Sequence, residues 1–416
     1  MQVFYRKWKE FCLCAPNEAL FPAGAEPCTG PFAPLVFLVA RDPATSRGLY
    51  AIREPYELDE PETASCLNTC APGGALPDAL AGFVRRNGAG VLNVRFGNAF
   101  RVLRAWHAAK PDGLVLTLVG LGDVGGTALL ALKLLGHMFK RIQIYDPNAA
   151  QCARYEMELN QVLSPDGLPL PEIVVCEEQA LFACDLFAFT ASRGVPGLDT
   201  RVQDVRMAQY DANREMVGSY AQKAREAGFT GLFCQISDPV DHLARSVFLQ
   251  SSQNADGIYD YAGLLPEQVQ GFGLGVMAAR CAYYAKQLGL DGSQLRVYGP
   301  HGQGLVCANS CMQAYDAAIS AALTEKTRTA NLRVRELGFK PYLAPALSSA
   351  AVSLLQLVRG DVHYGAVPLG GAYFGCRSRM TRLGVRLVRE EICPPLLQQL
   401  EQTRRTLASF AYECGG

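Results

Sequence analysis

The feature that most constrains this chain is an apolar stretch followed at once by a glycine-rich turn. The stretch from Leu114 to Val119 is long and apolar enough for a buried parallel strand. Three glycines follow in the spacing Gly120-x-Gly122-x-x-Gly125. In this spacing the first glycine permits a tight turn, the second lets the backbone approach a pyrophosphate, and the third lets the next helix pack closely. The segment therefore predicts a strand, a phosphate-binding turn and a helix.

An acidic residue beyond that helix indicates which nucleotide the turn would bind. A second predicted strand ends at Asp146, about 20 residues after the last glycine. A carboxylate there can accept hydrogen bonds from both hydroxyls of the adenosine ribose, but it would repel the 2′-phosphate of NADP. At the helix start, the free N–H groups of Asp123 and Val124 would face the phosphates. The alternative is a turn that needs glycine for packing alone. Because strand, helix and acid are in register, we expect nucleotide binding with NAD as the cofactor.

Length and composition set the outer bounds. A chain of 416 residues exceeds one typical core, so two or three domains are expected. Its 49% hydrophobic and 19% charged residues are typical of a globular protein. Lys plus Arg equals Asp plus Glu at 39 each, which gives no charge basis for binding nucleic acid or a membrane. Neither a signal peptide nor a membrane-length apolar run is evident, so we expect a cytoplasmic protein.

The cysteines are numerous but scattered. Fifteen are spread over the whole chain, which favours buried thiols over disulfide bridges in a large intracellular protein. The local pairs Cys12/Cys14 and Cys66/Cys70 lack the spacing and the companion histidines of a zinc site. We therefore expect no metal.

The order of predicted elements divides the chain into three parts. Residues 1–110 contain short predicted strands at 34–40 and 48–52 and a helix at 77–86, and they are expected to form a small appended domain for capping or oligomerisation. From 111 to 262 the pattern alternates as in a doubly wound sheet, with predicted helices at 149–162 and 204–227 and strands at 172–176, 185–190 and 231–237. Ligands bind at the carboxyl ends of such strands, so Thr190 and Ala191 are further candidate cofactor contacts. Residues 263–416 would form a substrate domain, with strands at 364–367 and 371–374 and a helix at 394–410.

Four motifs at the expected strand ends resemble a known family. They are Asp185-Leu-Phe-Ala-Phe-Thr-Ala-Ser, Ser237-Asp-Pro-Val-Asp, Gly271-Phe-Gly-Leu-Gly-Val-Met-Ala-Ala-Arg and Tyr298-Gly-Pro-His-Gly-Gln-Gly. In this order, across residues 112–405, they resemble the landmarks of the lactate/malate dehydrogenase superfamily. The resemblance implies an α/β fold with a Rossmann NAD-binding domain followed by an α+β substrate domain, in a homodimer or homotetramer. It also implies hydride transfer between NAD and a small 2-hydroxy acid.

The resemblance assigns roles to particular residues. His301 occupies the position of the proton donor and acceptor, a task that suits a side chain titrating near neutrality. Arg280 occupies the position of the arginine that binds the substrate carboxylate, since its planar fork pairs two oxygens at once.

The family's mobile loop adds another arginine, which lies seven residues before an asparagine and polarises the substrate carbonyl. Arg206 and Asn213 match that spacing. Arg193 and Arg201 lie in the same stretch, and either could take the role of Arg206 or contact a second acidic group of the substrate. The other interpretation is a solvated run of charge.

Three positions differ from the family pattern, and they indicate a substrate other than lactate. The acid that pairs with the histidine should lie three residues before Arg280, and that residue is Met277. The asparagine that touches ribose and substrate is Asp238, a carboxylate that would favour an iminium or ammonium group beside the reacting carbon. The threonine of the late substrate helix has no match near 343–349, where Ser348 and Ser349 are the only hydroxyls.

Two functions follow as hypotheses. The first is an NAD-dependent oxidoreductase acting on a small 2-hydroxy or 2-amino acid, with Asp238 among its catalytic residues. The second is a nucleotide-binding protein of dehydrogenase fold without turnover, which Met277 favours because a thioether cannot stabilise an imidazolium as a carboxylate does.

Overall fold

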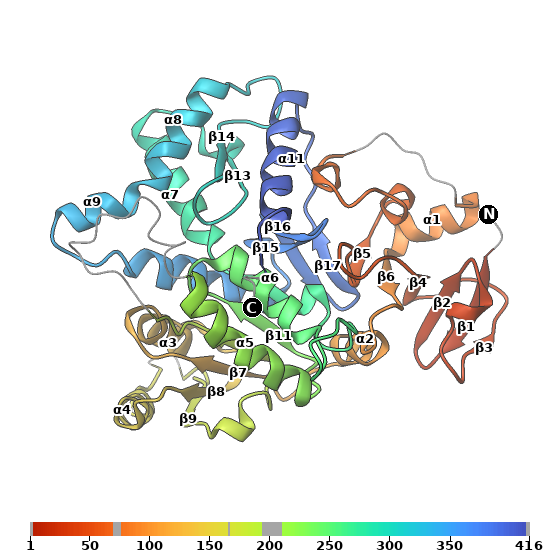
Figure 1. The fold of residues 1–416 in the computed structure, drawn as a ribbon, viewed down its shortest axis with the longest axis horizontal. Coiled ribbons are helices and arrows are strands. Elements are labelled where there is room, and N and C mark those ends of the chain that lie inside the picture. The colour runs from red at the N-terminus through yellow and green to blue at the C-terminus, as the bar shows by residue number, and fades with distance from the viewer. Residues whose placement is uncertain (1–2, 70–75, 165–166, 194–209, 413–416) are drawn as a thin grey trace.

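The structure is a computed structural model that describes residues 3–69, 76–164, 167–193 and 210–412. Within these residues, one sheet of fifteen strands crosses the molecule in the order β3-β1-β2-β4-β6-β5-β17-β16-β15-β12-β11-β10-β7-β8-β9 (Figure 1). The predicted site residues Arg201 and Arg206 lie outside the described residues. No described helix is long and apolar enough to cross a membrane. Each cysteine among the described residues is a free thiol, and most of these thiols are buried.

The parallel half of the sheet, from β7 to β12, has the predicted doubly wound order. Its parallel strands are β7 (Leu114–Val119), β8 (Phe139–Tyr145), β9 (Glu172–Val175), β10 (Leu186–Phe189), β11 (Leu232–Gln235) and β12 (Val269–Gly271). The helices between them are α3 (Asp123–Leu135), α4 (Ala149–Leu159), α5 (Tyr210–Glu226) and α6 (Val240–Ser251). The chain reverses direction in the sheet between β7 and β10, which is the place where such folds bind ligands.

The C-terminal half adds an antiparallel meander to the same sheet. Its strands β15 (His363–Leu369), β16 (Ala372–Thr381) and β17 (Gly384–Leu387) follow β12, and each pairs with the next in an antiparallel hairpin. Helix α11 (Pro394–Ala408) buries Leu396, Leu400 and Leu407 in one apolar cluster with residues of this meander. The remaining elements are α7 (Leu274–Gln287), α8 (Ala317–Arg328), α9 (Ala330–Glu336), the π-helix η8 (Pro345–Val352), α10 (Ser353–Arg359) and a two-stranded sheet of β13 (Arg296–Tyr298) and β14 (Val306–Ala308).

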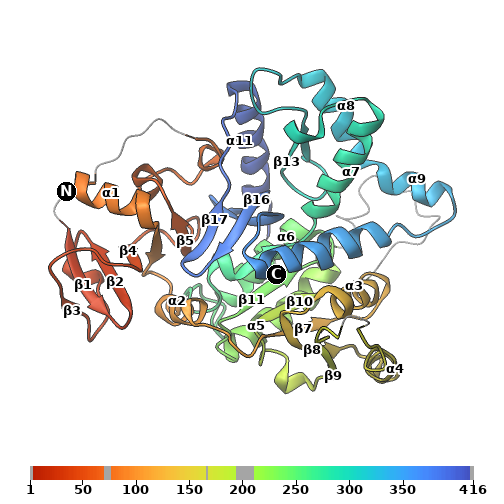
Figure 2. The same ribbon diagram turned by 180° about the vertical axis from the view of Figure 1, so that it is seen from behind.

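The N-terminal extension continues this sheet. It contains β1 (Phe4–Trp8), β2 (Phe11–Ala15), β3 (Glu26–Pro27), β4 (Leu35–Val39), β5 (Leu49–Ile52), β6 (Ala89–Asn93), α1 (Asp78–Asn87) and α2 (Ala99–His107). Strand β5 pairs with β6 on one side and with β17 on the other, and both views show the extension at the opposite end of the molecule from β9 (Figures 1 and 2). The join also contains a buried carboxylate, because Glu267 accepts hydrogen bonds from the backbone N–H groups of Gly48 and Leu49.

Several elements differ from the sequence expectations. The helix predicted to reach residue 162 ends at Leu159, and the short strand β3 lies where no strand was predicted. The helix predicted from 204 is seen from Tyr210, because 204–209 lie outside the described residues. Strands β2 and β6 escaped prediction because all their residues are buried, which removes the alternation that marks a strand with one exposed face.

Candidate active site

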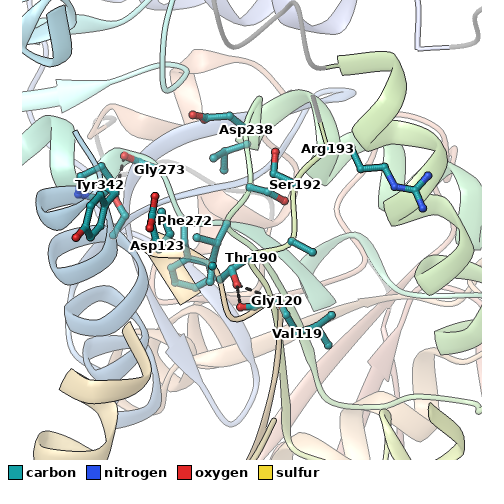
Figure 3. Close-up of a pocket in the computed structure, with 18 of the residues that line it drawn as sticks. Val119, Gly120, Asp123, Thr190, Ser192, Arg193, Asp238, Phe272, Gly273 and Tyr342 are labelled. Carbon is teal, nitrogen blue, oxygen red and sulfur yellow. Dashed lines mark hydrogen bonds between the residues drawn. The ribbon is translucent and has the colours of Figure 1, made fainter. Parts of the chain in front are cut away.

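A cavity of about 1000 Å³ lies at the carboxyl ends of the parallel strands. Its wall follows the ends of β7, β10, β11 and β12, at Val119, Thr190, Ile236 and Phe272. Residues of α7, α9 and η8 complete the opposite side. This is the crevice that the strand order predicts, and its volume suits a large cofactor together with a small substrate. Figure 3 shows how the labelled residues converge on it.

The three glycines of the turn play different parts. Gly120 has φ +92°, and a Cβ there would lie 2.6 Å from the Ala191 nitrogen. A Cβ on Gly125 would lie 1.9 Å from the Gly120 carbonyl oxygen. A Cβ on Gly122 would meet nothing within 4 Å, and this residue lines the cavity. Packing therefore explains two of the glycines, whereas the third leaves open space at the N-terminus of α3, where an anionic group can approach the backbone.

The turn is held by hydrogen bonds from neighbouring strand ends. The Thr190 hydroxyl donates to the carbonyl oxygens of Val119, at 2.9 Å, and Gly120, at 2.7 Å (Figure 3). The Asp146 carboxylate accepts from the backbone N–H of Leu121 at 2.8 Å and of Asn148 at 2.9 Å. Asp146 thus lies directly after β8 and lines the cavity, as the sequence predicts.

A cation opposite the turn was missed by the sequence analysis. The Asp123 carboxylate, at the first position of α3, forms an ion pair of 3.0 Å with Lys340. Lys340 comes from the segment between α9 and η8, together with Tyr342, and both line the cavity. No motif links these residues to the turn, because more than two hundred residues separate them in the sequence. Tyr220 also lines the cavity, and burial raises its pKa to about 12, so its hydroxyl stays neutral at neutral pH.

His301 is held on both sides by the protein. Its Nδ1 lies 2.6 Å from the Gly273 carbonyl oxygen, and its backbone N–H donates to the Asp241 carboxylate at 2.7 Å. A carbonyl oxygen can only accept, so Nδ1 carries the proton and Nε2 is the acceptor in the neutral ring. Nε2 lies 3.8 Å from Oδ1 of Asp238. The ring is 8% exposed, yet it reaches the cavity.

Met277, at the position where the resemblance implies an acid, packs into the apolar interior. Met277 is fully buried in an apolar cluster that also contains Cys281 and Leu305. Its sulfur lies 3.9 Å from a guanidinium nitrogen of Arg280. In this structure the Nδ1–H of His301 donates to the backbone carbonyl oxygen of Gly273.

Of the remaining predicted residues, Arg280 lines the cavity, whereas Asn213 is hydrogen-bonded to other protein groups. Arg280 lines the cavity from α7 on the same side as His301. Asn213 is fully buried, donates to the Ser192 hydroxyl at 3.1 Å and to the Asp238 carbonyl at 2.8 Å, and accepts from the Arg193 N–H at 2.7 Å. These bonds let Asn213 support the segments that follow β10 and β11, and its part in binding the substrate stays a prediction. Figure 3 shows the Arg193 side chain directed away from Asp238.

Comparison with known proteins gives a consistent picture. No protein-family model matches the sequence. The chain is 24% identical over 279 residues to an L-lactate dehydrogenase of Treponema denticola, covering 66% of this chain and 78% of that protein. It is 26% identical over 259 residues to L-lactate dehydrogenase 2 of Staphylococcus aureus, covering 62% and 73%.

Solved structures show the same likeness in three dimensions. A lactate dehydrogenase from a Medee basin deep-sea metagenome library matches with a TM-score of 0.56 and 17% identity, over 71% of this chain and 96% of that one. A malate dehydrogenase of Archaeoglobus fulgidus in complex with NADH matches with a TM-score of 0.57 and 16% identity, over 70% and 97%. The chain is a divergent relative of the lactate/malate dehydrogenases. Like them it combines a Rossmann half with an α+β half, and it adds the N-terminal extension to their fold.

Proposed function

We propose that this lactate/malate dehydrogenase relative is an NAD-dependent oxidoreductase acting on a small 2-hydroxy or 2-amino acid. The observation that supports this most strongly is a single cavity lined both by the glycine turn with Asp146 and by Arg280 with His301. One set of residues suits a dinucleotide and the other suits a carboxylate substrate and a proton. Their meeting at the switch point of the sheet brings the two ligands together.

The residues around the turn fit NAD. The open space beside Gly122 admits a pyrophosphate to the N-terminus of α3, and Asp146 can accept from the ribose hydroxyls with its remaining lone pairs. Lys340 offsets the charge of Asp123, which would otherwise oppose an anion at the turn. The bound nicotinamide would supply the hydride acceptor.

His301 can handle the proton of a 2-hydroxy acid. Because Nδ1 donates to Gly273, the acceptor lone pair of the neutral ring is on Nε2, which can take the hydroxyl proton as the hydride leaves the adjacent carbon. The 2-oxo acid results, and in the reverse direction the imidazolium returns the proton. Arg280 would bind the substrate carboxylate through two parallel hydrogen bonds.

Asp238 favours the amino acid over the hydroxy acid. Its carboxylate lies 3.8 Å from Nε2, close to the place where the reacting carbon would have to lie. When a neutral amino group assists hydride loss, the product is an iminium cation, which a neighbouring carboxylate stabilises in a partly dry site. A 2-oxo acid would gain nothing from Asp238. We therefore propose a 2-amino/2-imino acid couple as the preferred substrate pair.

A substrate panel tests this proposal. NAD reduction would be measured with 2-hydroxy acids and 2-amino acids for the wild type, Asp238→Asn, and Asp256→Asn as an exposed control that removes the same charge. We expect amino acid turnover by the wild type and the control, and a shift towards hydroxy acids in Asp238→Asn. Clear lactate or malate turnover by the wild type would refute the amino acid preference. Inactivity of every variant with every substrate would favour the non-catalytic nucleotide-binding protein.

Assembly into a homodimer or homotetramer remains a prediction. Helix α3 and the π-helix η8 pack together and expose leucines, among them Leu130, Leu134 and Leu347. Light scattering after size exclusion would test the prediction, and a monomer of 45.0 kDa would contradict it.

A further inference from the structure

A buried serine connects two elements behind His301. Ser349 lies on η8 and is 2% exposed. Its Oγ accepts from the backbone N–H of Val276 at 2.9 Å and donates to the Gly273 carbonyl oxygen at 3.0 Å. The same carbonyl accepts from Nδ1 of His301 at 2.6 Å. The result is a chain of hydrogen bonds from the first turn of α7, through the serine and the carbonyl, to the imidazole ring.

The beginning of α7 explains why this serine is needed. Gly273 is the N-cap residue of α7 and has no side chain with which to satisfy the free N–H groups of the first turn. Ser349 provides the missing cap from another helix, since it binds the N–H of Val276, the third residue of α7. Its hydroxyl hydrogen then remains for the Gly273 carbonyl, and this fixes the direction in which that carbonyl points.

The position before α7 also has to be glycine. A Cβ on Gly273 would lie 2.6 Å from Cβ of His301 and 2.9 Å from its Nδ1. Any side chain there would push the ring away from the carbonyl that binds it. The close approach of backbone and imidazole is therefore built into the sequence at Gly273, and Ser349 orients the backbone that makes the contact.

We propose that Ser349 is a positioning residue, which through the Gly273 carbonyl holds His301 in the Nδ1–H tautomer with Nε2 facing the cavity. The serine and the carbonyl together replace the carboxylate that Met277 cannot supply. The inference rests on the proposed function only in its claim about turnover, because the tautomer is a property of the protein alone. Ser349 also lines the cavity, but in this role its hydroxyl acts through Val276 and Gly273.

The replacement has a chemical consequence. A neutral carbonyl fixes the tautomer as a carboxylate does, but it stabilises the charged imidazolium less, because it lacks a full negative charge. Negative charge reaches the ring from other directions, because the Asp238 carboxylate lies 3.8 Å from Nε2 and the Asp241 carboxylate accepts from the His301 backbone N–H. The carbonyl of Gly273 thus sets the tautomer, and these two carboxylates face the proton that Nε2 would carry.

Nitrogen NMR of histidine-labelled protein tests the tautomer without substrate or cofactor. The chain has five histidines, so His301→Gln would assign the signal of interest. We expect the wild type and Ser348→Ala, a control at the neighbouring serine, to show Nδ1 protonated and Nε2 unprotonated at pH 8. In Ser349→Ala both nitrogens should move towards the averaged shifts of a free imidazole, and Ser349→Thr, which keeps the hydroxyl, should restore the wild-type shifts.

Turnover provides the second measurement. With a substrate found in the panel, Ser349→Ala should lower kcat about tenfold, the size of one lost capping interaction, with a smaller change in KM. Its pH profile should also shift, whereas Ser349→Thr should recover both kcat and profile. If Ser349→Ala does not fold, Ser349→Cys, which keeps only a weak donor, takes its place with the same direction of change.

The two measurements separate the two ideas. Unchanged histidine shifts and an unchanged pH profile in Ser349→Ala or Ser349→Cys would overturn the positioning role. Altered histidine nitrogen shifts in Ser349→Ala, in a protein that turns over no substrate, would support the positioning role of Ser349 and refute the enzymatic function.

Discussion

The glycine turn and the surroundings of His301 face one cavity, but they are built in different ways. The turn consists of a single segment, in which the spacing of Gly120, Gly122 and Gly125 determines the geometry. The histidine is held by Gly273 and Ser349, which come from two other segments. Met277 stands where the resemblance implies an acid, and the histidine donates from Nδ1 to the backbone carbonyl of Gly273. A site formed by one segment can thus be predicted from its sequence spacing. In a site formed by three segments, a residue can bind a different partner and keep its position, so the sequence pattern predicts less.

The largest expected effect breaks the turn itself. Gly125→Ala places a Cβ 1.9 Å from the Gly120 carbonyl oxygen and 2.5 Å from the Thr190 hydroxyl, so strand and helix must separate. We expect a loss of about 3 kcal/mol or more in unfolding free energy, as for an overpacked core, and no measurable NADH binding. Urea denaturation and NADH titration measure the two effects. Gly125→Ala with wild-type stability would show that the turn is less constrained than the histidine region.

The next change tests the substrate side of the cavity. Arg280→Lys keeps the positive charge but loses the fork that pairs two carboxylate oxygens. We expect kcat/KM to fall roughly a hundredfold, which is about 2.7 kcal/mol of transition-state binding, mostly through KM. Arg359→Lys, on the exposed face of α10, is the matched control. Equal kcat/KM for wild type and Arg280→Lys would remove the carboxylate assignment.

The pH dependence of turnover can be interpreted only when the pH dependence of folding stability is known, because buried side chains away from the cavity also titrate. Burial raises the pKa of Glu267 to about 7, although hydrogen bonds from Leu49 and Gly48 lower it. A carboxyl with a raised folded-state pKa contributes stability below its unfolded pKa of 4.5, and this contribution is lost as pH rises through about 7. The buried His363, whose pKa burial lowers to about 4, has the opposite slope at lower pH.

Replacing Glu267 separates its contribution to the pH dependence of stability from that of His363, which is the same in both proteins. We expect the unfolding free energy of Glu267→Gln, relative to the wild type, to increase by roughly 2 kcal/mol from pH 5 to pH 8, because glutamine never ionises. Denaturation curves at both pH values measure the difference. A constant difference would mean that Glu267 is ionised in the folded protein at both pH values, contrary to a raised pKa, and that pH profiles of turnover need no correction for this group.

The smallest expected effect concerns the choice of nucleotide. Asp146→Asn removes the charge that repels a 2′-phosphate, and it keeps an oxygen acceptor for only one of the N–H groups of Leu121 and Asn148, which bind different carboxylate oxygens. We expect the preference for NADH over NADPH to shrink about tenfold, with a loss of about 1 kcal/mol in unfolding free energy for the hydrogen bond that is lost. Competitive titration with both nucleotides gives the ratio. An unchanged ratio would mean that the preference comes from another part of the cavity.

The sequence predicted the parts that depend on local pattern. The strands and helices from β7 to β11, the open position at Gly122 and the placement of Asp146 follow from hydrophobic runs and glycine spacing. The partners of these residues in space did not follow. Lys340 meets Asp123 across the cavity, Ser349 reaches Gly273 from a π-helix, and Asn213 supports the loop ends, because each contact joins segments that carry no common motif. Buried strands such as β2 were missed since burial on both faces leaves no alternation.

Nucleotide titration tests the central claim most directly, because the catalytic and the non-catalytic function both require NAD at the glycine turn. NADH and NADPH would be titrated by fluorescence into the wild type and into Gly122→Ala, whose added Cβ meets no protein atom within 4 Å and should leave the fold intact. The account predicts saturable binding of NADH to the wild type, at least about tenfold weaker binding of NADPH, and loss of NADH binding in folded Gly122→Ala. Absence of saturable NADH binding to the wild type, or wild-type affinity in Gly122→Ala, would contradict it.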